Sequence, residues 1–304
     1  MNEEYGVEPE FFRTATDLKL FLNHFGMMEG RFIAEFPRSL LKRIHEHVSK
    51  NLSGIERAAA VAALEKAEKT KCAFIRSGRQ FDPQISWTDN AAKYQSGSSG
   101  KSFWRVLAAQ ANTWRFPTIG EMDTEDFFSG TRDAQILGIA DEYANVAEQI
   151  ISRGPEVYVV DPYFCPVTQM ADSYRVLVEL LARSVESKCE AFVFVVRAAH
   201  VLEKKRFTVD DVKAGMLEAR TKAGSNVKVE VRFVDDSSRK LHARYLFSVH
   251  GGLRFDHGLS ELPRGQENDV SMLDKTMLTS IRSQFITEDN GPEVIHRIEI
   301  KPCD

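Results

Sequence analysis

The sequence lacks the features that mark a membrane-spanning, secreted or disulfide-bonded protein. No apolar run approaches the ~18 residues that a helix needs to cross a bilayer. The four cysteines lie far apart and none belongs to a Cys-x-x-Cys motif, so neither a zinc site nor a disulfide framework is indicated. The acidic N-terminus has neither the basic nor the apolar region of a signal peptide. We therefore expect a cytoplasmic protein without a transmembrane segment.

An excess of positive charge is absent as well. The formal net charge is −4 and neither half of the chain is strongly basic, so bulk charge does not indicate a nucleic-acid-binding protein. A polyanionic partner would have to be held by a local patch. Residues 239–264 offer one, with five Arg or Lys and three His against two acidic residues. The alternative interpretation is a solvated, charged turn.

The composition, with 43% apolar and 28% charged residues in 304, indicates a globular protein with an ample core. Apolar residues at helical spacing predict helices over 17–25, 40–48, 54–70 and 124–151. Arg153-Gly154-Pro155 ends the last of these, because Gly followed by Pro is a strong stop. We place a domain boundary there, after a mostly helical N-terminal domain over 1–153.

Strands and helices alternate after that boundary. The predicted strands are 157–160, 191–196, 227–233, 253–255 and 294–300, and the predicted helices are 167–187, 208–222 and 270–285. The run over 191–196 is continuously apolar, as expected for a strand buried on both faces. We predict an α/β fold, in which the helical N-terminal region precedes a mixed-sheet sandwich over 154–304 with helices on both faces.

A further strand, predicted over 241–249, carries the clearest functional signal. Alternation places apolar side chains on one face, and His242 and Arg244 together on the other. An imidazole and a guanidinium side by side in an apolar run cost desolvation unless partners or a ligand satisfy them. A Gly251-Gly252 turn follows. The pattern indicates a site for a phosphate or another anion.

This arrangement resembles a single half-domain of the phospholipase-D-like superfamily. That superfamily uses a His-x-Lys pair, an Asp five residues beyond the Lys, and a Gly-Ser-x-Asn-type turn. His242 matches the histidine that attacks phosphorus, Arg244 stands at the Lys position and Val249 at the Asp position. The turn Gly258-Leu259-Ser260-Glu261 is an approximate counterpart of the last motif. The pattern is closer to the degenerate branch, which includes the C-terminal domain of the MIT-domain-containing proteins.

The resemblance covers roughly 155–300 and implies a phosphate site built on His242 and Arg244. The chemistry of the superfamily needs no metal and no cofactor. The further ligand-binding residues that we expect are Lys240, Arg254, His257, Ser260, Glu261 and Asp161. Two alternatives stay open, since His242 could be a buried histidine bonded to a carbonyl and Asp161 could cap a helix.

The missing Asp has four candidate replacements, namely Asp235, Asp236, Asp256 and Glu261. His250 and His257 flank the Gly-Gly turn, but no carboxylate spacing supports a metal site there.

Three functions are compatible with these residues. The first is binding of a phosphodiester or another phosphate-containing ligand, such as nucleic acid, or of a partner, without turnover and in a bacterial defence setting. The second is an active, metal-independent phosphodiesterase or nuclease with His242 as nucleophile. The third is a structural scaffold whose first domain docks a protein through Trp87, Trp104 and Trp114, although core packing is the favoured interpretation of these tryptophans. Because phospholipase-D-like sites use two motif copies and this chain has one, the resemblance also implies a homodimer.

Overall fold

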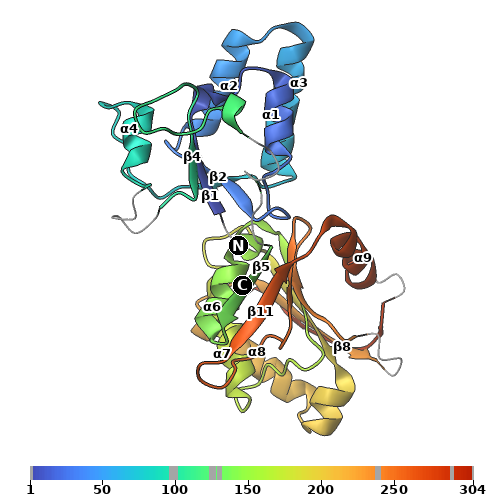
Figure 1. Cartoon of the computed structure of the whole chain (residues 1–304). Helices are drawn as coiled ribbons and strands as arrows, with labels where there is room; N and C mark the ends of the chain where they lie inside the picture. Colours follow the sequence, from blue (N-terminus) through green and yellow to red (C-terminus); the bar gives the residue numbers. More distant parts are fainter. Residues whose placement is uncertain are drawn as a thin grey trace. The chain divides into compact units, whose positions relative to one another are not determined.

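The computed structural model divides the chain into two compact units, Met1–Thr131 and Arg132–Asp304 (Figure 1). The structure describes residues 3–95, 102–122, 128, 132–236, 241–287 and 291–302. Over these ranges, none of the helices combines the length and the apolar character that crossing a membrane requires.

The first unit contains a parallel sheet. Its strands are β1 (Glu3–Val7), β2 (Arg31–Glu35), β3 (Phe74–Arg76) and β4 (Arg105–Leu107). They pair in the order β3-β2-β1-β4, and each neighbouring pair is parallel. The prediction of a mostly helical region is therefore corrected. These strands are short and largely buried on both faces, so they show no alternation of polar and apolar residues.

Helices accompany this sheet at the predicted places. They are α1 (Ala15–Leu22), α2 (Leu40–Asn51), α3 (Gly54–Lys69) and α4 (Trp87–Ala92), with short 3-10 turns η1 (Pro9–Phe11) and η2 (Ile119–Glu121). The helices predicted over 17–25, 40–48 and 54–70 are confirmed. Trp87 is buried and donates its indole N–H to the Phe36 carbonyl at 2.8 Å. Trp104 and Trp114 are 59% and 50% exposed, so the core interpretation holds for Trp87 alone.

The second unit is built on a mixed sheet. Its strands are β5 (Asp133–Leu137), β6 (Glu156–Val160), β7 (Ala191–Arg197), β8 (Lys228–Asp235), β9 (Arg244–Phe247), β10 (Gly252–Phe255), β11 (Glu267–Met272) and β12 (Glu293–Ile300). Their order is β12-β8-β7-β6-β9-β10-β11-β5. The central strands β6, β7 and β8 are parallel, and the remaining pairs are antiparallel.

Helices cover both faces of this sheet. They are α6 (Ala140–Arg153), α7 (Ala171–Ala182), α8 (Val209–Lys222) and α9 (Lys275–Phe285), and a π-helical turn η3 (Ala199–Lys204) follows β7. Figure 1 shows α6, α7 and α8 on one side and α9 on the other. Tyr143 of α6 packs on Phe255, and Arg232 donates to the Phe285 carbonyl of α9. The strand register places Phe255 and Arg232 on opposite faces of the sheet, so α6 and α9 cover opposite faces. The α/β class is confirmed.

The boundary between the units differs from the predicted one. β5 pairs with β11, and α6 packs on α7, so both belong to the second unit. The boundary at 153/154 is therefore corrected to 131/132. Gly154 closes α6, with its N–H bonded to the Ile150 carbonyl at 2.9 Å, and the chain then enters β6 of the same sheet. A Gly-Pro pair ends a helix whether or not a domain also ends.

Three predicted elements are corrected by the sheet pairing. In the described part of 124–151, where one helix was predicted, the chain forms β5 and then α6. Over 270–285, where another helix was predicted, the chain forms the end of β11 and then α9. The strand predicted over 241–249 is limited to β9. Leu246, Phe247 and Ser248 are buried in succession, so both faces of this strand are covered and neither is a free polar face.

Candidate anion-binding site

Polar side chains gather where the parallel strands of the second sheet end. Asp161 follows β6, Arg197 ends β7 and Asp236 follows β8. β9 runs antiparallel to β6, so its first residue, Arg244, comes to the same edge. In open α/β sheets, ligands bind outside the carboxyl ends of the parallel strands. This edge of the sheet is therefore a candidate binding site.

Tyr163 is the common neighbour of three side chains at this edge. The Cζ atoms of Arg197 and Arg244 each lie 5.3 Å from its ring centroid, and the His200 ring makes an edge contact at 5.2 Å. The Tyr163 side chain remains 42% exposed. An aromatic face attracts a guanidinium cation but supplies no lone pair to accept its N–H groups. Two cations are thus held around one half-exposed ring.

Arg197 is fixed by the segment that follows β8. Its Nη2 donates to Asp236 Oδ2 at 2.5 Å and to the Leu241 carbonyl at 3.0 Å. Asp236 Oδ1 accepts the backbone N–H of Leu241 at 2.9 Å, and its carboxylate is fully buried. Asp236 is therefore committed to Arg197 and Leu241, and it does not serve as the free carboxylate that the missing motif Asp would require.

Arg244 is a half-buried cation that lacks a carboxylate partner. Its Nη1 donates to the Asp256 carbonyl at 2.6 Å, and it forms no ion pair with any described residue. Its Nε is buried without a hydrogen-bond partner, and so is the Nε of Arg197. Each of these arginines also keeps one terminal nitrogen that reaches solvent and has no acceptor within the described ranges. A buried donor without an acceptor costs about 1–3 kcal/mol, and two such donors flank one tyrosine.

Asp161 joins the end of β6 to the turn around Gly258. Its Oδ1 accepts the N–H of Tyr163 and its Oδ2 accepts the N–H of Leu259, both at 2.9 Å. The residue is 2% exposed, and this burial raises the pKa of its carboxyl, against the opposing effect of those N–H groups and of Arg244. The next α-helix, α7, begins well downstream, so the alternative in which Asp161 caps a helix is wrong. Asp161 instead caps a turn.

Ser260 and Glu261 hold the same turn against α6 and α7. Ser260 Oγ lies 2.7 Å from Ser173 Oγ, and the Ser260 carbonyl accepts the Tyr143 hydroxyl at 2.9 Å. Glu261 accepts the first backbone N–H of α6 at 2.9 Å and forms an ion pair with Arg175. These two predicted ligand-binding side chains are therefore engaged in positioning the turn.

The other predicted basic residues do not join Arg244. Arg254 is exposed and lies opposite Tyr245 in the register, so it is on the other face of the sheet from Arg244. His257 is exposed, and its backbone N–H donates to Asn268 Oδ1 at 2.9 Å. Lys240 lies outside the described residues.

His242 is exposed and lies before β9. The alternation that placed its ring on the face of Arg244 does not apply there, because residues 241–243 are not in a strand. The interpretation of His242 as a buried histidine is wrong. Within the part of the chain that the structure describes, its ring has no hydrogen-bond partner, and no carboxylate orients it.

Tyr163, Arg197 and His200 were missed as site residues. One signal was available, since Arg197 directly follows the continuously apolar run over 191–196. A charged residue at the carboxyl end of a buried parallel strand is placed at the edge where ligands bind. The contacts of Tyr163 with Arg197 and Arg244 join segments that are far apart in sequence, so local sequence patterns do not predict them.

Side chains that could bind a metal ion are not clustered among the described residues. Among the described residues, no three His, Cys, Asp or Glu side chains are grouped as a metal ion would need. Cys72, Cys165 and Cys189 are buried and form no disulfide bond with a described residue, and burial raises the pKa of the Cys165 thiol to about 11. Such thiols are inert at neutral pH.

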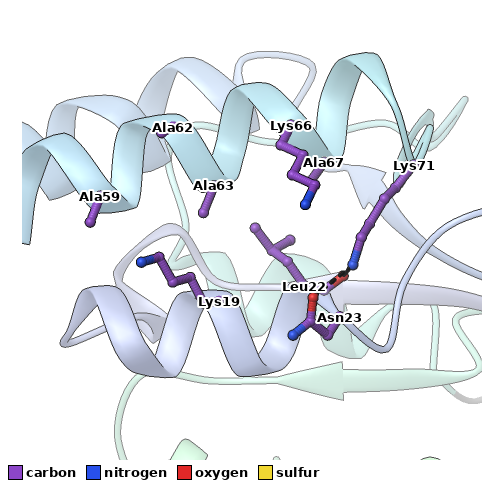
Figure 2. A pocket seen from close by; sticks show the side chains of 9 residues that line it. All are labelled: Lys19, Leu22, Asn23, Ala59, Ala62, Ala63, Lys66, Ala67 and Lys71. Atoms are coloured by element: carbon purple, nitrogen blue, oxygen red, sulfur yellow. Dashed lines mark hydrogen bonds between the residues drawn. The ribbon is translucent and has the colours of Figure 1, made fainter.

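The first unit contains a groove between α1 and α3, with a volume of about 320 Å³ (Figure 2). Alanines of α3 line it, and Lys19, Lys66 and Lys71 extend along it. Lys71 donates to Asn23 Oδ1 at 2.8 Å, whereas Lys19 and Lys66 form no ion pair with the residues described. The groove offers positive charge but no buried donor that lacks an acceptor, and in this it differs from the edge of the second sheet.

The sequence matches no protein-family model and no curated protein. Among solved structures, the chain is similar to TrmBL2, an archaeal chromatin protein whose structure shows a novel mode of DNA binding, with 14% identity and a TM-score of 0.32. The similarity covers 57% of this chain and 57% of that one. At that TM-score the likeness carries no argument about the fold or the ligand of this chain.

Proposed function

We propose that the second unit binds a phosphate-containing anion, specifically a phosphodiester, at Arg197 and Arg244 beside Tyr163. The observation that carries the proposal is Arg244, a half-buried cation that has no ion pair among the described residues and a buried Nε without an acceptor. Buried Asp161 acts on Arg244 electrostatically but forms no ion pair with it, and an anion at the open terminal nitrogen of Arg244 would supply the direct contact that this cation lacks. Arg197, already fixed by Asp236, would supply a second donor.

The chemistry of these groups favours a phosphate. A guanidinium binds phosphate and carboxylate with its planar fork, and it keeps its charge at every physiological pH. Two separate guanidinium groups suit an anion with oxygens pointing in several directions. The exposed part of Tyr163 leaves an apolar surface between them for the organic portion of a diester.

Binding without turnover is the form of the function that we propose. A nucleophilic histidine needs a partner that fixes its tautomer, and His242 has none among the described residues. The phosphodiesterase hypothesis stays a prediction, and hydrolysis of a bis-aryl phosphodiester in EDTA, abolished by His242→Ala, would establish it. The phospholipase-D-like resemblance, the homodimer, the protein partner of the first unit and the defence setting also stay predictions.

The test compares two arginines from neighbouring strands. Arg244→Ala should weaken binding of a fluorescent dinucleotide by about 1–3 kcal/mol, or roughly 5- to 150-fold, the range for losing a charge-assisted contact. Arg254→Ala removes an equal charge from the opposite face of the same strand pair and should leave the affinity unchanged. Equal affinities of both variants and the wild type would eliminate the proposed site.

A further inference from the structure

We infer that the anion site continues along η3 as a basic track through His200, Lys204 and Lys205, and that its ligand is a single-stranded nucleic acid rather than one isolated phosphate. This inference rests on the proposed function, since the track begins at Arg244 and Arg197. It adds the class of ligand and residues outside the sheet edge.

The His200 ring connects the arginines around Tyr163 to the turn η3. η3 begins two residues after Arg197, and the His200 ring packs on Tyr163 at 5.2 Å. The backbone N–H of Lys205 donates to the His200 carbonyl at 3.0 Å, the i to i−5 bond that ends the π-helical turn η3, so Lys205 lies one such turn after His200. The Tyr163 ring therefore touches Arg197, Arg244 and His200, and His200 is joined directly to the lysine segment.

Three consecutive basic residues end and follow η3, beside one acidic residue of that turn, Glu203. Lys204, Lys205 and Arg206 are consecutive and exposed, and none of them has an ion-pair partner in the described ranges. Burial, then Lys205, Lys204 and Arg197, lower the pKa of His200. Arg206 adopts a φ of +61°, in the left-handed region that costs energy for a non-glycine residue. Clustered like charges repel one another, and a polyanion relieves that repulsion.

A single strand fits this surface better than a duplex. The guanidinium groups of Arg197 and Arg244 lie against the half-exposed Tyr163 ring, which offers an aromatic face to an unpaired base, and the bases inside a duplex have no free face to stack on it. A flexible strand can bend one phosphate inward while the next ones follow the exposed lysines, and aromatic side chains between basic ones are typical of such sites. The rigid backbone of a duplex cannot adapt in this way.

The experiment measures binding of a dinucleotide and of an oligothymidylate of roughly 10 nucleotides, within the usual site size of ~4–16. Lys204→Ala/Lys205→Ala should weaken the longer ligand roughly tenfold at low salt and lower its salt slope by about 1–2, with little effect on the dinucleotide. Arg244→Ala should weaken both ligands. All three side chains lie at or near the surface, and thermal unfolding checks that each variant is folded.

Lys19→Ala/Lys66→Ala is the matched control, because it removes two unpaired lysines from the groove of Figure 2. It should leave both affinities unchanged, and a loss equal to that of the track variant would refute the track. If the track variant binds the longer ligand like the wild type while Arg244→Ala weakens the dinucleotide, the track is wrong and the proposed site survives. If Arg244→Ala changes neither ligand, both proposals fail. Equal affinity for a duplex of the same length would refute the single-strand assignment.

Discussion

The substitution Gly258→Ala probes the junction that places Arg244 beside Asp161. Gly258 has a φ of +92°, and a Cβ at this position would lie 2.7 Å from Asp161 Oδ2 and 3.5 Å from Arg244 Nε. The Asp161 oxygen cannot move aside freely, since it accepts the Leu259 N–H at 2.9 Å inside the protein. The added methyl group must therefore displace the buried carboxylate or the turn.

Two contributions set the size of the effect. An alanine in the left-handed region costs about 1–2 kcal/mol. Loss of the hydrogen bond between Leu259 and the buried carboxylate costs a further ~1.5–3 kcal/mol, the range for a bond to a charged group. We expect Gly258→Ala to lower the free energy of unfolding of the second unit by about 2.5–5 kcal/mol.

Gly265→Ala separates these contributions. Gly265 has a φ of +81° and nothing within 4 Å of an added Cβ, so only the conformational cost applies. Urea unfolding followed by far-UV circular dichroism reports both units, whereas the three tryptophans all lie in the first unit and their fluorescence follows that unit. Equal destabilisation by Gly258→Ala and Gly265→Ala would refute the reasoning, because the contact with Asp161 would then contribute nothing.

Substitutions at three further residues test the neighbouring groups. Asp161→Asn replaces one acceptor oxygen by a donor and should lower the free energy of unfolding by ~1–3 kcal/mol. Burial raises the pKa of Asp161 in the folded protein, so the wild type should lose stability as the pH rises from the ordinary aspartate pKa through the folded pKa. The Asp161→Asn variant should not show this pH dependence. The pKa of His200 is lowered in the folded protein, so the wild type should lose stability as the pH falls from 6.5 through the folded pKa. His200→Gln should abolish this loss, and a variant whose stability depends on pH like that of the wild type would contradict the assignment. Tyr163→Ala should weaken dinucleotide binding by about 1–3 kcal/mol, the range for removing an aromatic ring on which a base stacks. Tyr163→Phe should bind like the wild type, and an equal loss in both variants would assign the effect to the hydroxyl.

The sequence predicted the central strands of the second unit because they carry strong local patterns, whereas β5 and the end of β11 lay within predicted helices. The run over 191–196 is apolar throughout, and the helix predicted over 208–222 is α8, which opens with a capping box of Thr208 and Asp211. The parallel strands of the first unit escaped prediction. β3 and β4 have three residues each, too few for any period to appear.

The site was only partly predictable. Arg244 was predicted from its place in an apolar run, and Asp161 from the phospholipase-D-like resemblance. Their mutual position, and the packing of Arg197 and His200 on Tyr163, depend on the order of β6, β7, β8 and β9 in the sheet. Such non-local pairing leaves no trace in local periodicity. The expected pairing of His242 with Arg244 assumed a strand over both, and β9 begins only at Arg244.

A crystal structure of the protein soaked with a dinucleotide tests the phosphate site most directly. We predict a phosphate within hydrogen-bond distance of the open terminal nitrogens of Arg197 and Arg244, beside the Tyr163 ring. A phosphate bound in the lysine groove between α1 and α3, with none at these arginines, would contradict the proposed site.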